Sequence, residues 1–251
     1  MSVLQDILVN LIDDVDYNKF REYYVNSRKL DREAVEWGIS ILTSDVNEKK
    51  RLSEIANTEL DKTLISNFGE ACVSYYLENK LEVILTHAGW KQSPFVISTG
   101  VDLVGGKISD LSNISIVYVE VKTRKNSSHK YQTLKSLKNQ LTLNRIEQKF
   151  TLSTGDYSYI GITSRLRKHI RENKVFSQAK INFRKDYFER YGAVVAGERD
   201  LWEKIIKKAH PMDSSSNRPC NLLLLIVEEL ETRFKEIFFI ESIVDKRTGA
   251  P

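Results

Sequence analysis

The stretch from residue 98 to residue 122 constrains the fold most, because two short apolar runs flank a connection rich in Gly, Ser and Asp. In the second run, Val117, Val119 and Val121 alternate with other residue types. A β-strand has a side-chain period of two, so these valines share one face while Glu120 and Lys122 share the other. The pattern therefore predicts a strand with one apolar face and two charges on the opposite face.

The first run carries one acidic residue, Asp102, inside a short β-branched segment. Gly105-Gly106 and the polar residues 109–113 follow it, and such residues favour turns. We therefore expect the chain to turn back here and form a hairpin. In such a hairpin Asp102 and Glu120 converge on one point, and Lys122 lies about 6–7 Å along the strand from Glu120.

Two carboxylates beside a lysine suit phosphoryl chemistry. Mg²⁺ prefers hard oxygen ligands, and proteins often bind it through one or two carboxylates together with a substrate phosphate. A neighbouring ammonium can stabilise charge that develops on a phosphoryl group or help to deprotonate the attacking water. Asp102 and Glu120 are therefore candidate metal ligands and catalytic residues, with Mg²⁺ as the expected cofactor and Mn²⁺ as its substitute. Lys122 is the candidate electrostatic and proton-handling residue.

At these positions the sequence resembles the PD-(D/E)XK, or restriction-endonuclease-like, nuclease superfamily. The family pattern is an Asp, a variable spacer and Glu-X-Lys on the next strand, and Asp102, Glu120, Val121 and Lys122 match it. The family's proline before the Asp is missing here. The resemblance covers residues 58–163 and implies an α/β fold. Its core would have the order α-β-β-β-α-β, with a mixed central sheet flanked by helices.

The same resemblance implies a further acidic residue on the helix before the hairpin, and Glu70 in FGEACVSYYLE is the candidate. Helical spacing places Glu70 on one face with Val73 and Leu77, where a buried carboxylate is costly unless a metal or a lysine compensates it. We therefore expect Glu70 to act as a supporting metal ligand and catalytic residue.

Positive charge is concentrated in two blocks, although the whole chain has a formal net charge of only +4. Residues 122–149 contain eight Lys/Arg and one acid, and residues 165–190 contain nine Lys/Arg and three acids. Basic blocks beside a catalytic lysine are what binding to a phosphate backbone requires. The candidate nucleic-acid-binding residues are Arg124, Lys125, Lys130, Lys135, Lys138, Arg145, Arg165, Arg167 and Lys168.

The 251 residues can hold one large or two small domains. Apolar residues at a helical period predict a helical N-terminal segment over residues 1–57, followed by the nuclease domain with a C-terminal extension over residues 58–251. We expect a helix over 59–81, a strand over 81–87, a helix over 130–150 and a strand over 157–163. Residues 221–244 are apolar enough for strands, but periodicity leaves strand and helix open.

Cysteine usage and hydropathy favour a cytoplasmic protein. The two cysteines, Cys72 and Cys220, are far apart and form no CxxC pair, which is typical of a reducing compartment and of buried thiols. No apolar run is long enough to span a bilayer, so we expect no membrane contact.

The sequence therefore predicts a Mg²⁺-dependent nuclease that hydrolyses DNA phosphodiester bonds, in prokaryotic anti-phage defence or restriction. The chain is also similar to HamA, the nuclease subunit of Hachiman anti-phage defence, which implies a helicase or another defence partner. A stand-alone restriction enzyme would instead be a homodimer. DNA or RNA as substrate, and endo- or exonuclease action, stay open.

Two other interpretations of the same residues stay open. The chain could be a non-catalytic nucleic-acid-binding or partner-docking subunit that keeps a nuclease-like fold. Alternatively, the two acids could form a structural ion pair with Lys122.

Overall fold

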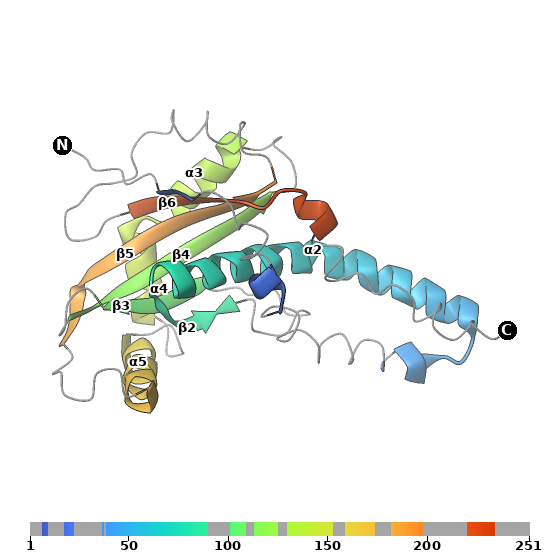
Figure 1. The fold of residues 1–251 in the computed structure, drawn as a ribbon, viewed down its shortest axis with the longest axis horizontal. Coiled ribbons are helices and arrows are strands. Elements are labelled where there is room, and N and C mark those ends of the chain that lie inside the picture. Colours follow the sequence, from blue (N-terminus) through green and yellow to red (C-terminus); the bar gives the residue numbers. More distant parts are fainter. Residues whose placement is uncertain are drawn as a thin grey trace.

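The computed structural model of the protein describes residues 7–9, 18–22, 37, 39–89, 101–108, 113–124, 130–152, 159–173, 182–197 and 220–233. In chain order its elements are β1 (Ile7–Val9), α2 (Val46–Lys80), β2 (Ile84–Ala88), β3 (Leu103–Ile108), β4 (Asn113–Arg124), α3 (Lys130–Gln140), α4 (Leu143–Leu152), α5 (Tyr159–Asn173), β5 (Asn182–Ala196) and β6 (Cys220–Ile226). The strands form one six-stranded sheet in the order β1-β6-β5-β4-β3-β2, with helices on both of its faces (Figure 1).

The sheet is mixed, and β4 is the strand at which its two halves meet. β2, β3 and β4 pair antiparallel, whereas β4, β5, β6 and β1 pair parallel. Parallel neighbours require crossover connections, and α3, α4 and α5 lie between β4 and β5 in the chain. This arrangement confirms the predicted α/β class with a mixed sheet.

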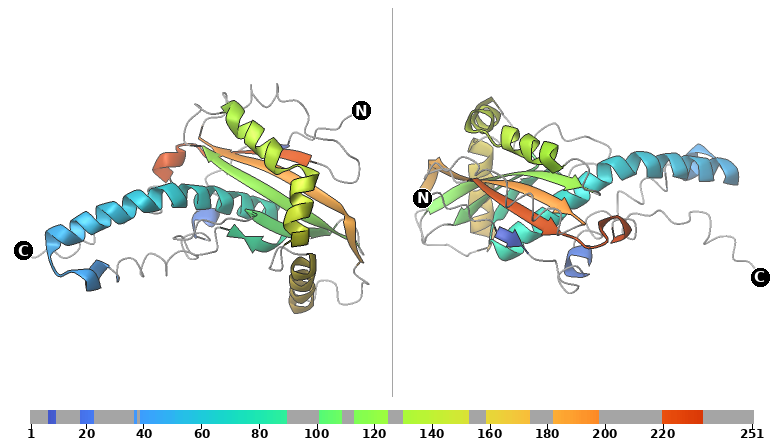
Figure 2. Two further views of the ribbon diagram at one scale, coloured as in Figure 1. Left: turned by 180° about the vertical axis from the view of Figure 1, so that it is seen from behind. Right: turned by 90° about the horizontal axis from the view of Figure 1, so that it is seen from above.

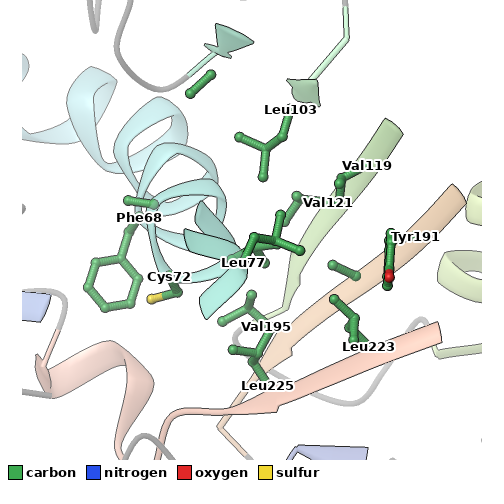
Figure 3. Packing of buried hydrophobic residues seen from close by; sticks show 14 of the residues in the cluster. Phe68, Cys72, Leu77, Leu103, Val119, Val121, Tyr191, Val195, Leu223 and Leu225 are labelled. Carbon is green, nitrogen blue, oxygen red and sulfur yellow. The ribbon is translucent and has the colours of Figure 1, made fainter. Parts of the chain in front are cut away.

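Each face of the sheet has its own apolar cluster. On one face the second half of α2 packs against Val117, Val119 and Val121 of β4, and Figure 3 shows Leu77 among side chains from β4, β5 and β6. On the other face α3, α4 and α5 pack against Tyr118 and its neighbours, and Figure 2 shows these helices on the side opposite α2. The predicted alternation along β4 is therefore confirmed.

The helix α2 is 35 residues long, which corresponds to about 50 Å at 1.5 Å per residue. Asp45 caps its N-terminus by accepting a hydrogen bond from the Glu48 amide at 2.8 Å. Its second half contributes to the core, and the first half extends beyond the sheet (Figures 1 and 2). The side chains near its start, Trp37, Ile41 and Leu42, are exposed.

The predicted hairpin forms, but its two glycines are not the turn. β3 and β4 pair antiparallel, and both Gly105 and Gly106 lie inside β3. A Cβ at Gly105 would stand 2.5 Å from the carbonyl oxygen of Ile84, so glycine is needed where β2 approaches closely. The residues that connect β3 to β4, 109–112, lie outside the described part of the chain.

Several other predicted elements differ from the structure. The strand predicted over 157–163 is wrong, because α5 begins at Tyr159 and packs Ile162 and Leu166 into the apolar cluster one helical turn apart. The strand after the crossover is β5 instead.

The helix predicted over 130–150 is divided into α3 and α4. Residues 220–226 form strand β6, which settles the open choice there, and 234–244 lie outside the described residues.

The predicted N-terminal segment is only partly helical. Residues 18–22 and 39–42 are helical, but Ile7–Val9 is a strand that pairs with β6, so the helix prediction is wrong there. The boundary predicted at residue 57 falls inside the continuous helix α2. In the part of the chain that the structure describes, no helix is both long and apolar enough to cross a membrane.

Candidate active site

The candidate site lies at the end of the β3–β4 ladder. The last paired residues are Leu103 and Val119, so Asp102 and Glu120 stand next in register, and beyond them β4 continues beside β5. Here the amide of Val121 donates a hydrogen bond of 2.7 Å to Asp102 Oδ2. The carboxylate of Asp102 thus takes the place of a strand carbonyl and is fixed against β4. Asp102 and Glu120 are therefore neighbours in the register of the hairpin, and the Asp102 carboxylate contacts the backbone of the residue after Glu120.

Glu120 is a buried carboxylate with two unlike oxygens. Its residue is 5% exposed. Lys122 Nζ donates to Oε1 at 2.8 Å, whereas Oε2 is buried and accepts no hydrogen bond from the described residues. A buried oxygen of an ionised group without a hydrogen bond is costly, and such atoms are rare in folded proteins. The second oxygen is therefore suited to an additional ligand such as a cation.

Lys122 connects this pair to solvent. The Lys122 side chain is 25% exposed to solvent, whereas the Glu120 side chain is 7% exposed. An ammonium group has three N–H donors, and Glu120 Oε1 accepts from one of them. A substrate group that enters from the solvent side can therefore reach the remaining donors.

Tyr118 is a member of the site that the charge pattern did not single out. It lies two residues before Glu120 on the same face of β4 and is fully buried. Burial raises the pKa of its hydroxyl well above the usual range. The carboxylates of Glu120 and Asp102 raise this pKa further, and the Arg145 guanidinium partly offsets them. Both carboxylates thus raise the pKa of the same phenol. The alternation that places Glu120 and Lys122 on one face of the strand also places Tyr118 there, so the sequence contained the signal for this residue.

Glu70 lies on α2, which covers the other face of the sheet. It is 6% exposed and therefore buried, as the helical spacing predicted. Gly69 beside it contacts Thr123 of β4, on the face that faces α2. In the described residues no three His, Cys, Asp or Glu side chains lie close enough together to hold a metal ion. The structure therefore joins Glu120 to Lys122 and fixes Asp102 on the neighbouring Val121 amide, whereas Glu70 forms no three-acid group with them among the described residues.

The candidate nucleic-acid-binding residues are divided between surface and structural positions. Lys135 and Lys138 on α3, Arg145 on α4, and Arg167 and Lys168 on α5 are exposed. All three helices cover the face of the sheet that carries Glu120 and Lys122. The exposed basic side chains therefore lie on the same side of the sheet as the carboxylate–lysine group.

Two of the predicted contacts are already engaged within the protein. Arg124 is half-buried, which lowers its pKa, and its Nε donates to Thr133 Oγ1 of α3 at 2.7 Å. Arg165 donates from NH1 to the carbonyl of Thr86 at 2.6 Å. Lys130 is the first residue of α3, and Lys125 lies outside the described residues.

Arg190, the last residue of the second basic block, is a core residue. It is 2% exposed and donates to the carbonyl of Leu141 at 2.8 Å. Its charge therefore cannot contribute to a phosphate-binding surface. Cys72 and Cys220 are both buried, as predicted, and burial raises the pKa of the Cys72 thiol.

Comparison with known proteins adds no relative. No protein-family model matches the chain, and no curated protein matches it.

Proposed function

We propose that the protein is a metal-dependent nuclease that hydrolyses phosphodiester bonds in DNA. The observation that carries this proposal is the pair of carboxylates at the end of the β3–β4 ladder. Asp102 is fixed by the Val121 amide. Glu120 is buried with one oxygen on Lys122, and its other oxygen accepts no hydrogen bond from the part of the chain that the structure describes. The order α2-β2-β3-β4, then crossover helices, then β5 supports a restriction-endonuclease-like core.

The residues present suit a divalent cation in part. Two carboxylates are too few for a cage made only of protein side chains, but Mg²⁺ is commonly bound through one or two carboxylates and completed by waters and substrate phosphate. Asp102 and Glu120 would hold it, with the buried Oε2 of Glu120 as one oxygen ligand. When bound, such a cation polarises the phosphoryl group and lowers the pKa of a bound water.

The protein's own residues would orient and stabilise the reacting groups. Asp102 is held in one direction by its hydrogen bond to β4, so that little reorganisation is needed on substrate binding. Lys122 is positioned through Glu120, and its remaining N–H donors can contact a phosphoryl oxygen or the attacking water. Its position at the border of solvent allows a proton to leave towards water.

The setting that we propose is prokaryotic anti-phage defence or restriction, in the cytoplasm. This setting follows from the resemblance to PD-(D/E)XK nucleases and to the HamA subunit. The resemblance to HamA implies that the chain acts with a helicase or another defence protein as its partner. A homodimer that cuts both strands is the competing assembly. Sedimentation of the purified chain alone and with DNA distinguishes a stand-alone dimer from a subunit.

Metal dependence is the first test of the function. We expect cleavage with Mg²⁺ or Mn²⁺, none in EDTA, and at most binding with Ca²⁺, because Ca²⁺ prefers more ligands at longer distances. The measurement is digestion of supercoiled, linear and single-stranded DNA, with single-stranded RNA as a parallel substrate. Efficient cleavage in EDTA would remove the metal roles of Asp102 and Glu120, and cleavage of RNA alone would change the substrate.

Binding to the phosphate backbone is the second test. We expect affinity for DNA to decrease steeply with salt, with log K falling by roughly 0.9 per phosphate contact for each unit of log salt. Reversal of Lys135, Lys138 and Arg145 to Glu should weaken binding equally for unrelated sequences and reduce this slope. Fluorescence anisotropy over a salt series measures both quantities.

A matched charge change on α2 is the control for this experiment. Reversal of Lys49, Lys50 and Lys80 to Glu alters the net charge by the same amount, but these residues lie on a helix that covers the opposite face of the sheet. It should change the salt slope much less. Equal effects of the two triple variants, or an effect on one DNA sequence only, would contradict a backbone-binding surface on α3 and α4.

A structural role for the charges is the second candidate function, and the ion pair between Lys122 and Glu120 favours it. In that case the chain would be a non-catalytic nucleic-acid-binding or docking subunit. Buried ion pairs are weak evidence for stability, since a hydrophobic pair of similar size is often as stable. The substitutions described in the Discussion separate the two roles.

A further inference from the structure

The short strand β2 contains a β-bulge that changes which side of the sheet its residues face. Leu85 pairs with Gly105 and His87 with Val104, so Thr86 is an additional residue in β2. Leu85 and Ala88 both pack with the cluster under α2, although regular alternation would place them on opposite faces. The extra residue therefore reverses the alternation and places His87 on the face that carries Glu120 and Lys122.

His87 contacts the backbone immediately before Asp102. It is 7% exposed, and its Nε2 lies 3.1 Å from the carbonyl oxygen of Val101. A carbonyl oxygen only accepts, so Nε2 must carry the proton and donate. Two residues further along the chain, the Gly89 amide donates to the carbonyl of Asp102 at 2.7 Å. The end of β2 thus holds the carbonyls of both residues 101 and 102.

The bulge is itself held from α5. The hydroxyl of Thr86 donates to the carbonyl of Val104 at 3.2 Å. Its own carbonyl, displaced from the regular ladder by the bulge, accepts the 2.6 Å hydrogen bond from Arg165 NH1. A continuous set of hydrogen bonds therefore runs from Arg165 through residues 86–89 to the backbone of Asp102.

We propose that His87 is a positioning residue for Asp102, and that Arg165 maintains this arrangement by holding the bulge. The carboxylate of Asp102 can meet the Val121 amide only if its backbone is fixed, and His87 with Gly89 fixes it. The effect of this positioning on catalysis rests on the proposed nuclease function. The positioning of Asp102 by His87 does not depend on that function, and it can be measured without an activity assay.

That readout is hydrogen exchange of the Val121 amide, whose proton is held by Asp102. In His87→Leu we expect exchange at Val121 to accelerate about five- to tenfold, which is the scale of one hydrogen bond. Amides of β6 should keep the parent's rates, since a loss of global stability would accelerate both. His87→Gln keeps an N–H donor at a similar position and should stay within about twofold of the parent.

Arg165→Met removes the hydrogen bond to the Thr86 carbonyl and changes only an exposed side chain, so the core stays intact. It should accelerate exchange at Val121, whereas Arg167→Met removes the same charge from α5, keeps the bond to Thr86 and should not. An unchanged Val121 rate in both His87→Leu and Arg165→Met would overturn the proposal, as would equal acceleration in β6.

Cleavage assays of the same variants show whether the nuclease function or the positioning role of His87 fails. If the parent cleaves DNA, His87→Leu should lower kcat about tenfold with little change in KM, and His87→Gln should restore most of it. If the parent cleaves no nucleic acid with any metal, the nuclease function fails, while the exchange data still decide the role of His87. If the parent cleaves and the Val121 rate never changes, the positioning role fails alone.

Discussion

Replacement of Glu120 by Gln is expected to reduce DNA cleavage about 10²- to 10³-fold, the scale of losing a preorganised electrostatic group in an active site. Gln has the same size, so the packing around this buried residue should persist. The substitution removes the charge that holds Lys122 and that, in the proposed function, would hold a cation. Lys122→Met should cause a loss of similar size. Single-turnover cleavage of labelled DNA with saturating Mg²⁺ measures the effect, with circular dichroism of each variant.

The double variant distinguishes catalysis from a structural ion pair. If the pair is structural, Lys122→Met leaves the buried Glu120 carboxylate uncompensated and lowers the free energy of unfolding by about 3–5 kcal/mol. Glu120→Gln leaves a partly exposed ammonium and should cost less, and the double variant restores much of the loss caused by Lys122→Met. If the pair serves catalysis, Glu120→Gln combined with Lys122→Met stays inactive whatever its stability. Glu228→Gln removes an exposed carboxylate after β6 and is the control. Full activity in either single variant would end the assignment of this site.

The central hairpin was predictable because its signal is local. Alternation of Val117, Val119 and Val121 with charged neighbours needs only the geometry of one strand, and the structure confirms both faces. The positions of Asp102 and Glu120 directly after the last pair, Leu103 and Val119, followed from the same alternation once a hairpin was assumed. What the pattern did not show was how Asp102 is fixed, since its hydrogen bond goes to the Val121 backbone.

Features that depend on contacts distant in sequence were not predictable. The run at residues 157–163 is too short for its period to separate strand from helix, and packing of Ile162 and Leu166 on the sheet decides for helix α5. The bulge at Thr86 depends on the register between β2 and β3, which no single segment contains. Likewise, helical spacing indicated that Glu70 is buried, but which face of the sheet α2 covers is a property of the assembled fold.

Replacement of Gly69 by Ala is expected to lower the free energy of unfolding by about 3 kcal/mol, at the upper end for overpacking. An added Cβ would stand 1.8 Å from Thr123 Oγ1 and 3.0 Å from Thr123 Cβ. Rotation of Thr123 relieves the first contact but not the second, because Cβ is fixed by the strand. Helix propensity acts in the opposite direction, favouring Ala by about 1 kcal/mol. Since Gly69 has no positive φ, close approach is the reason for the glycine.

Chemical denaturation of a double-mutant cycle checks this cause. Thr123→Ala removes Oγ1 and Cγ2 but leaves Cβ, so Gly69→Ala should cost clearly less in the Thr123→Ala background than in the parent. Ser66→Ala, at an exposed position of the same helix, should be neutral or slightly stabilising. Thr123 directly follows Lys122, so displacement of α2 from β4 should also reduce cleavage, and Thr123→Ala should recover part of both losses. A Gly69→Ala variant as stable as Ser66→Ala would show that α2 can move away from β4 without cost, and the link between this helix packing and the site would be lost.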